Sequence, residues 1–330
     1  MKKTTLVFYT KPTDNAREFF QWMSQRLPQE VNLVMVDNTR PLETQAAACR
    51  EAQMILPFRG RLTMDLIKRC PNLKLIQVTS AGTDHFDKPA LAEMGIRVAN
   101  NGGGNAVAVS EHTVMLIVMA YRKGGLQIMD TQSGRWDERI RGADIHQFHE
   151  LTDKVVGIVG LGRIGQEVAK RLQGWNCKLI YTDIRKFPKE LEQQLRVERV
   201  EFDTLISTAD IITLHVPLTA QTRAMISRRE FTMMKPTAIL VNACRGPVVD
   251  EKALYDALSS HRILGAAIDV TEMEPTPVNN PLLKLENVTV TPHVAGLSLE
   301  SRYKSLSLAL ENASRLANGQ EPKSLVAIDE

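Results

Sequence analysis

The stretch VVGIVGLGRIG, residues 155–165, decides the fold of this chain. The apolar run Val155–Val159 predicts a buried strand, and apolar residues at helical spacing predict a helix over Gln166–Leu172. Between them, Gly160, Gly162 and Gly165 complete the pattern GxGxxG. A strand, this glycine turn and a helix are together typical of a unit that binds a dinucleotide, with the pyrophosphate on the helix N-terminus.

Each glycine has its own reason in such a turn. The first permits a tight turn, the second lets the backbone approach the pyrophosphate, and the third allows close packing of helix on strand. Arg163 and Ile164 lie between the last two glycines and are further candidate contacts to the cofactor. Unpaired N–H groups and the dipole at a helix N-terminus both favour an anion there.

An acidic residue at the end of the next predicted strand supports the same interpretation. Asp183 lies eighteen residues beyond Gly165, where a carboxylate accepts hydrogen bonds from the adenosine ribose. Because a carboxylate repels a 2′-phosphate, the sequence favours NAD as the cofactor. Arg185 and Lys186 follow closely, so NADP stays open as the alternative.

Outward from this stretch, short apolar runs alternate with helical patterns, which predicts an α/β fold with parallel sheets. Three glycines, residues 102–104, interrupt the pattern. We predict two Rossmann-like domains: a flavodoxin-like substrate domain of residues 1–102 and 296–330, and an NAD(P)-binding domain of residues 103–295. The expected strands are Thr5–Tyr9, Val31–Val36, Met54–Leu56 and Leu75–Val78 in the first domain, and Val155–Val159, Lys178–Thr182, Ile211–His215, Ala238–Asn242, Gly265–Val270 and Val288–Thr291 in the second.

The same patterns predict the other main elements. Expected helices in the first domain are Ala16–Leu27, Leu42–Ala52 and Leu62–Cys70, and the second domain is expected to open on the helix Ala106–Tyr121. The polar segment Lys123–Glu150 is expected to be irregular. Leu299–Leu316 is expected to be an amphipathic helix that returns to cover the first domain.

Composition excludes several classes of protein. The net charge of +3 over 330 residues is too small to indicate a nucleic-acid partner. Four scattered cysteines fit free thiols in a reducing compartment, and the histidine spacing predicts no metal site. The N-terminal apolar run is too short for a signal peptide, and no run is long enough to cross a membrane. We therefore expect a cytoplasmic protein.

Three charged residues follow successive later strands, at the edge where open α/β sheets hold their ligands. They are Arg245, Glu274 and His293. A guanidinium can bind a carboxylate through two hydrogen bonds, and imidazole exchanges protons near neutral pH. A carboxylate paired with that imidazole would orient it and favour its charged form. The sequence thus predicts a site that binds an acid and moves a proton.

The ordered motifs resemble those of the D-isomer-specific 2-hydroxyacid dehydrogenases, among them glyoxylate/hydroxypyruvate reductases and phosphoglycerate dehydrogenases. The resemblance spans nearly the whole chain and is carried by residues 80–87, residues 105–112, the glycine turn, residues 214–219 and the three charged segments. It implies an oxidoreductase that transfers a hydride between NAD(P)H and C2 of a small 2-keto or 2-hydroxy acid. It also implies a homodimer, with Lys123–Glu150 as the dimerisation arm.

The resemblance further implies a role for each matching residue. Arg245 would bind the substrate carboxylate, His293 would be the general acid/base, and Glu274 rather than Glu272 would pair with it. Asp269 would hold the nicotinamide carboxamide, and backbone N–H groups of Ala81 and Gly82 would complete the carboxylate pocket. Other cofactor contacts fall on His215, Pro217, Thr222 and Ala243, with Arg245 and His293 also beside the cofactor.

The sequence restricts the identity of the substrate less than it restricts the type of reaction. Phosphoglycerate dehydrogenases usually have Arg-Ser where this chain has Pro57 and Phe58, so Phe58 is a candidate substrate contact and glyoxylate or hydroxypyruvate is favoured. Arg59 and Arg61 keep a phosphoglycerate dehydrogenase-like activity open. A corepressor-like protein that senses NAD is the alternative from another class. Cys244 adjoins Arg245 and is either a redox-sensitive thiol or a small buried residue.

Overall fold

The computed structural model describes residues 3–58, 60–136 and 145–328. The chain folds into two compact units: Met1–Asn105 with Ser298–Glu330, and Ala106–Leu297. It therefore leaves the first unit after its fifth strand and returns to it through the last helix. No helix among the described residues is long and apolar enough to cross a membrane.

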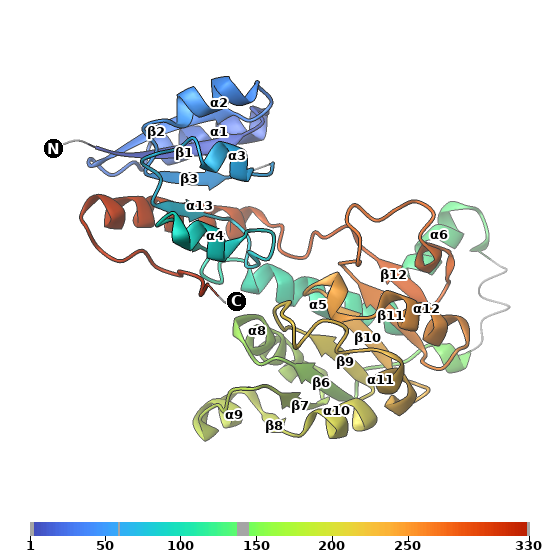
Figure 1. The fold of residues 1–330 in the computed structure, drawn as a ribbon. Coiled ribbons are helices and arrows are strands. Elements are labelled where there is room, and N and C mark those ends of the chain that lie inside the picture. The colour runs from blue at the N-terminus through green and yellow to red at the C-terminus, as the bar shows by residue number, and fades with distance from the viewer. Residues whose placement is uncertain (1–2, 59, 137–144, 329–330) are drawn as a thin grey trace. The chain divides into compact units, whose positions relative to one another are not determined.

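The first unit is a parallel five-stranded sheet covered by helices on both faces (Figure 1). Its strand order, β2-β1-β3-β4-β5, is that of flavodoxin-like folds, as the sequence predicted. The strands are β1 Thr4–Thr10, β2 Val31–Asp37, β3 Met54–Pro57, β4 Leu75–Gln77 and β5 Arg97–Ala99, and the helices are α1 Asp14–Ser24, α2 Leu42–Cys49, α3 Met64–Ile67, α4 Lys88–Glu93 and α13 Leu299–Ala317.

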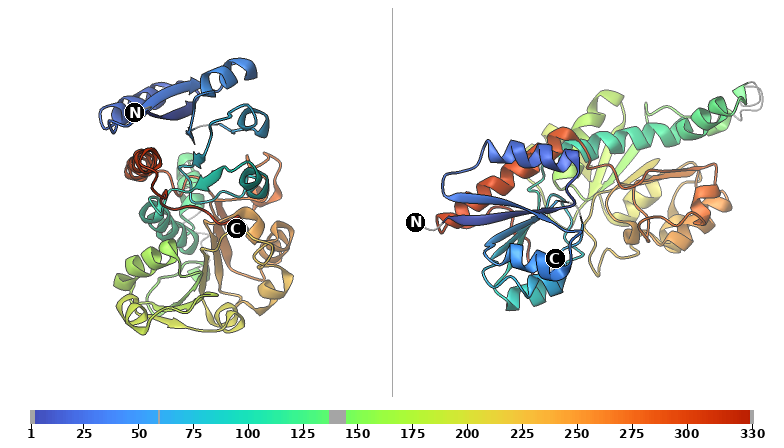
Figure 2. Two further views of the ribbon diagram at one scale, coloured as in Figure 1. Left: turned by 60° about the vertical axis from the view of Figure 1, so that its left-hand side comes forward. Right: turned by 90° about the horizontal axis from the view of Figure 1, so that it is seen from above.

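Alternating side chains of this sheet enter two different cores. Leu6 and Phe8 of β1 face α13, where they pack with Leu306 and Leu310, while Val7 faces the opposite core. Burial on both faces is typical of parallel sheets covered by helices. Figure 2 shows α13 beside α1 on one face of the sheet. The expectation that the last helix covers the first unit is confirmed.

The second unit is a parallel seven-stranded sheet in the order β12-β11-β10-β9-β6-β7-β8. Its strands are β6 Val155–Val159, β7 Lys178–Thr182, β8 Val197–Arg199, β9 Ile211–Leu214, β10 Ile239–Asn242, β11 Gly265–Ile268 and β12 Val288–Val290. The expected count of six strands was wrong. The additional strand β8 has one buried residue, Val197, and two exposed ones, so it carries no apolar run to detect.

Helices cover both faces of this sheet as well (Figure 1). One core includes α5 and α8, and the other includes α10, α11 and α12. The helices are α5 Ala106–Tyr121, α6 Gly124–Gln132, α8 Arg163–Leu172, α9 Lys189–Leu195, α10 Phe202–Thr208, α11 Arg228–Met233 and α12 Glu251–Ser259, with 3₁₀ turns η1 Ile145–Gln147, η2 Gln173–Trp175, η3 Gly246–Val248 and η4 Pro281–Lys284. The strand order reverses direction between β6 and β9, and ligands bind at such a point in open sheets.

Several elements differ from the expectation. The segment Lys123–Glu150 is not wholly irregular, because it contains α6 and η1; residues 137–144 of it lie outside the described residues. Helix α8 begins at Arg163 rather than Gln166, so the last glycine of the turn is already helical. The short elements β5 and α4 were not predicted. Neither reaches seven residues, too few to show a period.

Candidate active site

The glycine turn after β6 is closed by contacts that exclude side chains. Gly160 has a φ of +93°, and a Cβ on it would lie 2.7 Å from the carbonyl oxygen of His215 at the end of β9. A Cβ on Gly165 would lie 2.2 Å from the carbonyl oxygen of Gly160. Both distances are far inside van der Waals contact, so helix α8 can approach the strand only with glycine at these positions.

The middle of the turn is open and suits a pyrophosphate. A Cβ on Gly162 would meet only the Nη2 atom of Arg185, at 3.6 Å. The N-terminus of the ten-residue helix α8 has no side-chain cap. The first N–H groups of the helix, at Arg163 and Ile164, therefore lie at an uncapped positive dipole end beside open backbone. This cradle fits the pyrophosphate of a dinucleotide.

Asp183, directly after β7, is hydrogen-bonded to the glycine turn. Its Oδ2 atom accepts a hydrogen bond from the N–H of Leu161 at 2.8 Å, and Oδ1 accepts one from the N–H of Arg185 at 2.8 Å. The guanidinium Nε of Arg185 lies 3.5 Å from the same oxygen. A carboxylate has about four lone-pair sites, so two backbone bonds leave acceptor capacity for a ribose hydroxyl.

The loop after β9 is held by Thr222. Its hydroxyl donates to the carbonyl oxygen of Pro217 at 2.6 Å and accepts from the N–H of Thr219 at 2.8 Å. Burial lowers the pKa of His215 in this loop to about 3, so its imidazole is neutral at physiological pH. The Nδ1 atom of His215 is buried and has no partner within the described ranges, as expected for a polar group beside a ligand site.

His293 and Glu274 form the ion pair that the sequence predicted. Nδ1 of His293 donates to Oε2 of Glu274 at 2.6 Å, and both side chains are partly exposed, at 48% and 36%. The hydrogen bond that His293 donates to Glu274 raises the pKa of His293, whereas burial lowers it. The other glutamate, Glu272, is exposed, and its N–H donates to Glu251. Because Nδ1 of His293 is hydrogen-bonded to Glu274, the Nε2 atom of the ring is left to exchange a proton.

The His293 loop is held by a buried carboxylate. Asp269, only 1% exposed, accepts hydrogen bonds from the N–H groups of Val294 at 3.0 Å and Ala295 at 2.8 Å. Its own carbonyl oxygen accepts from the N–H of His293 at 2.8 Å. His293 has a φ of +54°, a left-handed conformation that is uncommon for a residue other than glycine. Asp269 thus holds the backbone of His293 and of the two residues that follow it.

His112 of helix α5 supports this aspartate, a role that was not predicted for it. Its Nε2 atom lies 3.0 Å from Oγ1 of Thr291 and 3.5 Å from Oδ1 of Asp269. Thr291 donates to the same oxygen at 2.6 Å. Burial alone would raise the pKa of Asp269, but the hydrogen bonds from His112, Thr291 and the backbone lower it. A signal existed, since residues 105–112 belong to the family motifs.

Arg245 lies in the loop after β10, close to the histidine. Its charge is among the interactions that lower the pKa of His293, while its Nη1 donates to the carbonyl oxygen of Cys244 at 2.7 Å. Next to it, a Cβ on Gly246 would lie 1.9 Å from the carbonyl oxygen of Thr271. This glycine lets the arginine loop touch the loop that carries Glu274. All three charged residues therefore gather at one sheet edge.

Two further predicted positions sit beside Arg245. Ala243 is buried at the end of β10. Burial raises the pKa of Cys244 to about 11, and its thiol donates to Oδ1 of Asn242. Because the thiolate is the reactive form, a thiol that stays protonated and packs against the core favours the interpretation of Cys244 as a packing residue.

The predicted carboxylate-binding segment lies in the first unit. Ala81 is exposed and Gly82 is half-buried. Neither N–H has an acceptor among residues that the structure describes. Phe58 is only 6% exposed and packs on Phe8 and Phe19, with ring centroids 4.8 and 5.4 Å apart. Its ring belongs to the core, so it offers little surface to a ligand. Arg59 lies outside the described residues.

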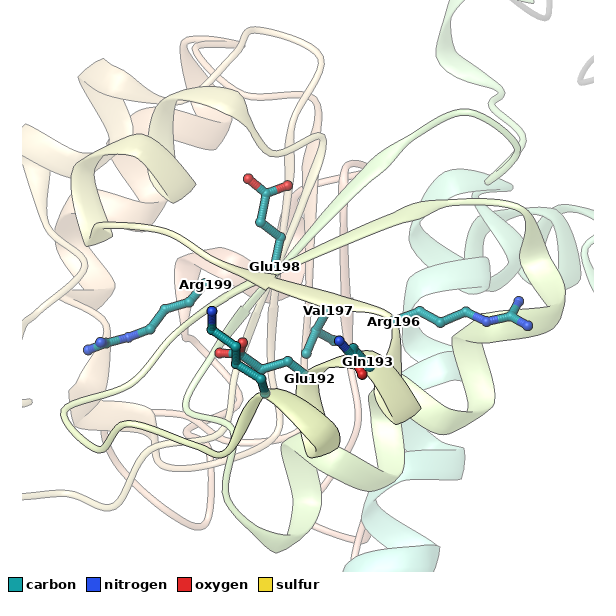
Figure 3. Close-up of a pocket in the computed structure, with 7 residues that line it drawn as sticks. Glu192, Gln193, Arg196, Val197, Glu198 and Arg199 are labelled. Atoms are coloured by element: carbon teal, nitrogen blue, oxygen red, sulfur yellow. The ribbon is translucent and has the colours of Figure 1, made fainter.

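A hollow elsewhere on the second unit is not part of this site. Figure 3 shows that the side chains of Arg196 and Arg199 point in different directions there, and that Glu198 points away from both. Their charges do not converge on one ligand. The residues that line it include none of the predicted site residues; they are Lys189, Glu192, Gln193, Arg196, Val197, Glu198 and Arg199.

Known proteins resemble the chain over both units. A glyoxylate reductase of Thermofilum pendens is 39% identical over 81% of this chain and 78% of its own length. A glyoxylate/hydroxypyruvate reductase B of Yersinia pestis is 33% identical over 94% of this chain and 93% of its own. A D-3-phosphoglycerate dehydrogenase of Archaeoglobus fulgidus is 37% identical over 81% of this chain, which spans only 49% of that relative.

The fold has close counterparts among solved structures. The holo form of Rhodotorula graminis D-mandelate dehydrogenase superposes with a TM-score of 0.87 and 26% identity, covering 99% of this chain and 98% of its own. Residues 114–295 match the family described as D-isomer specific 2-hydroxyacid dehydrogenase, NAD binding domain. This range contains the glycine turn and the three gathered charges. The chain therefore belongs to the family of D-isomer-specific 2-hydroxyacid dehydrogenases.

Proposed function

We propose that this protein reduces a small 2-keto acid at C2, with the reverse oxidation of the D-2-hydroxy acid at the same site. The observation that carries the proposal is the His293–Glu274 pair at 2.6 Å, beside Arg245 and on the same sheet as the glycine turn. A proton donor and a carboxylate receptor near a dinucleotide cradle are the groups that this reaction requires.

The cofactor we propose is NADH, which supplies the hydride when bound. The turn from Gly160 to Gly165 and the start of α8 would hold its pyrophosphate, and Asp183 would accept from its ribose hydroxyls. Asp269 has one oxygen, Oδ2, with a single backbone hydrogen bond, which leaves capacity for the carboxamide. The rest of the cofactor would contact His215, Pro217, Thr222 and Ala243. Arg185 keeps NADPH as an alternative cofactor.

The chain's own residues then act on the substrate. Arg245 binds the carboxylate of the keto acid and stabilises the carbonyl oxygen as negative charge develops on it. His293, protonated and held by Glu274, donates its Nε2 proton to that oxygen. In oxidation the neutral ring takes the proton back. The N–H groups of Ala81 and Gly82, which have no acceptor among the described residues, would add two donors for the carboxylate.

Glyoxylate and hydroxypyruvate are the substrates we propose. The Yersinia relative named for them matches almost the full length of both chains, whereas the chain spans about half of the phosphoglycerate dehydrogenase relative. The test is consumption of NADH and NADPH with a panel of glyoxylate, hydroxypyruvate, pyruvate and phosphohydroxypyruvate. A lack of turnover with every keto acid, in a protein that still binds NADH, would favour a dinucleotide-sensing protein.

We expect Glu274→Gln to narrow the pH range of reduction. Reduction needs protonated His293, so the rate is full below the pKa of His293 and falls as pH rises through it. The carboxylate raises this pKa, so its loss moves the alkaline limit of kcat/KM to lower pH. The rate of oxidation, which needs the neutral ring, should rise over the pH range in which reduction is lost. Measured pH profiles decide this, with Glu272→Gln as the matched control. An unshifted profile would contradict the role of Glu274.

We also propose a homodimer that uses α6 and the residues after it. Exposed apolar side chains gather there: Ile128 is 53% exposed, Met129 60% and Trp136 62%. Large exposed apolar groups of this kind mark interfaces. Light scattering should give twice the mass of one chain, and a double variant, Ile128→Lys with Met129→Lys, should shift it toward the monomer. A monomeric wild-type protein would rule the proposal out.

A further inference from the structure

One side chain of the last helix joins the segment that is proposed to bind the substrate carboxylate to the core aromatic residue Phe58. Arg302, in the first turns of α13, donates from Nη1 to Oγ1 of Thr79 at 2.8 Å. Thr79 lies two residues before Ala81. The guanidinium carbon of Arg302 lies 4.7 Å from the ring centroid of Phe58. Arg302 is 223 residues from Thr79 in sequence, so the fold alone brings them together.

The segment that begins at Thr79 has few other attachments. The carbonyl oxygen of Thr79 accepts long hydrogen bonds, both 3.4 Å, from Ser305 of α13 and from Asn101. The carbonyl oxygen of Ser80 accepts from the N–H of Asn101 at 3.0 Å. The 2.8 Å bond from Arg302 is charge-assisted, and such bonds are about twice as strong as neutral ones.

The contact with Phe58 fixes the other side of the guanidinium. The ring is held by Phe8 and Phe19, so it is a rigid platform. A planar guanidinium stacks well on an aromatic face and still donates from its edge, which an ammonium group does less well. Arg302 can therefore keep one orientation while it holds the Thr79 side chain.

We propose that Arg302 is a positioning residue for substrate binding: it fixes the segment that presents the N–H groups of Ala81 and Gly82 against the end of β3. Its effect is on affinity for the keto acid, and not on the proton transfer or on the cofactor, whose residues lie in the other unit. The kinetic part of this proposal rests on the proposed function. The structural part does not.

The experiment compares Arg302→Gln, Arg302→Lys and Thr79→Val with the wild-type protein. Thr79→Val keeps the branched shape and removes only the hydroxyl. We expect Arg302→Gln to raise KM for the preferred keto acid about 10- to 100-fold, the factor that one charge-assisted hydrogen bond carries, with a smaller change in kcat. Arg302→Lys should recover part of the loss. The dissociation constant of NADH should not change.

A double-mutant cycle and hydrogen exchange separate positioning from a general loss of stability. Adding Thr79→Val to Arg302→Gln should raise KM little further, because both remove the same bond. Amide exchange in residues 79–83 should be faster in Arg302→Gln, with exchange in β6 and β9 unchanged. Lys304→Gln, an exposed position on the same helix, is the matched control.

The outcomes are distinct for the two proposals. With an active wild-type enzyme, an unchanged KM in Arg302→Gln overturns the positioning role. Additive effects of the two substitutions also overturn it. If the wild-type protein reduces no keto acid, the proposed function fails. Exchange in residues 79–83 then decides the positioning role: faster exchange in Arg302→Gln supports it, and equal exchange refutes it.

Discussion

Replacing His293 by asparagine is expected to lower kcat for keto-acid reduction by ~10²–10⁴, the usual contribution of a positioned general acid. Asparagine removes the proton donor but adopts the left-handed backbone that His293 has, at φ +54°. The loop held by Asp269 should therefore survive the change. Because the glycine turn and Asp183 are untouched, we expect the affinity for NADH to stay within about twofold of the wild-type value.

The matched control for this variant is His261→Asn. His261 is exposed, lies just after α12 and has nearly the same backbone conformation, at φ +52°. It should keep wild-type kinetics. Turnover is followed by NADH absorbance and binding by NADH fluorescence. A His293→Asn enzyme with wild-type kcat would remove His293 from the mechanism, whatever its pH profile.

The second large effect is expected at Arg245. Two charge-assisted hydrogen bonds to a carboxylate are worth ~1.5–3 kcal/mol each, so Arg245→Gln should lower kcat/KM by ~10²–10⁴. Arg245→Lys should recover only part of it, since an ammonium cannot bind a carboxylate through a planar fork. Arg228→Gln, an exposed arginine on α11, is the control.

The pH profile offers an independent check on Arg245. Its charge lowers the pKa of His293, so its removal should move the alkaline limit of reduction to higher pH. This shift is opposite to the one expected for Glu274→Gln. Equal shifts in the same direction for both variants would contradict the arrangement of the three charges. A kcat/KM within threefold of the wild-type value would contradict carboxylate binding by Arg245.

The parts of the fold that could be predicted from sequence are those with long apolar runs. The bounds of β6, β7 and α5 agree with the prediction, because each contains a run of apolar residues that is buried in the sheet or against it. Edge strand β8 was missed since Glu198 and Arg199 are exposed. Helix α6 was missed because Ile128 and Met129 are exposed and its one buried residue is the polar Asp130, so no apolar stripe faces a core.

The residues of the candidate site also include some that could be predicted from the sequence and some that could not. Glu274 and His293 were predictable, because each lies a few residues after a strand and each has a side chain with its own acid–base chemistry. His112 was not, because its task depends on a residue 157 positions away and only the packed helix α5 brings them together. Phe58 shows the reverse case. The resemblance to phosphoglycerate dehydrogenases, which usually have Arg-Ser at this place, suggested a substrate contact, but the ring of Phe58 packs on Phe8 and Phe19 instead.

The contact at Gly246 has a practical meaning for anyone who wishes to retarget this enzyme. A Cβ added at Gly246 would lie 1.9 Å from the carbonyl oxygen of Thr271. Even alanine would therefore push the loop that carries Arg245 away from the loop that carries Glu274. The spacing between the Arg245 loop and the loop that carries Glu274 is set by a backbone contact. A mutant library should therefore spare residues 244–246 and 271–274.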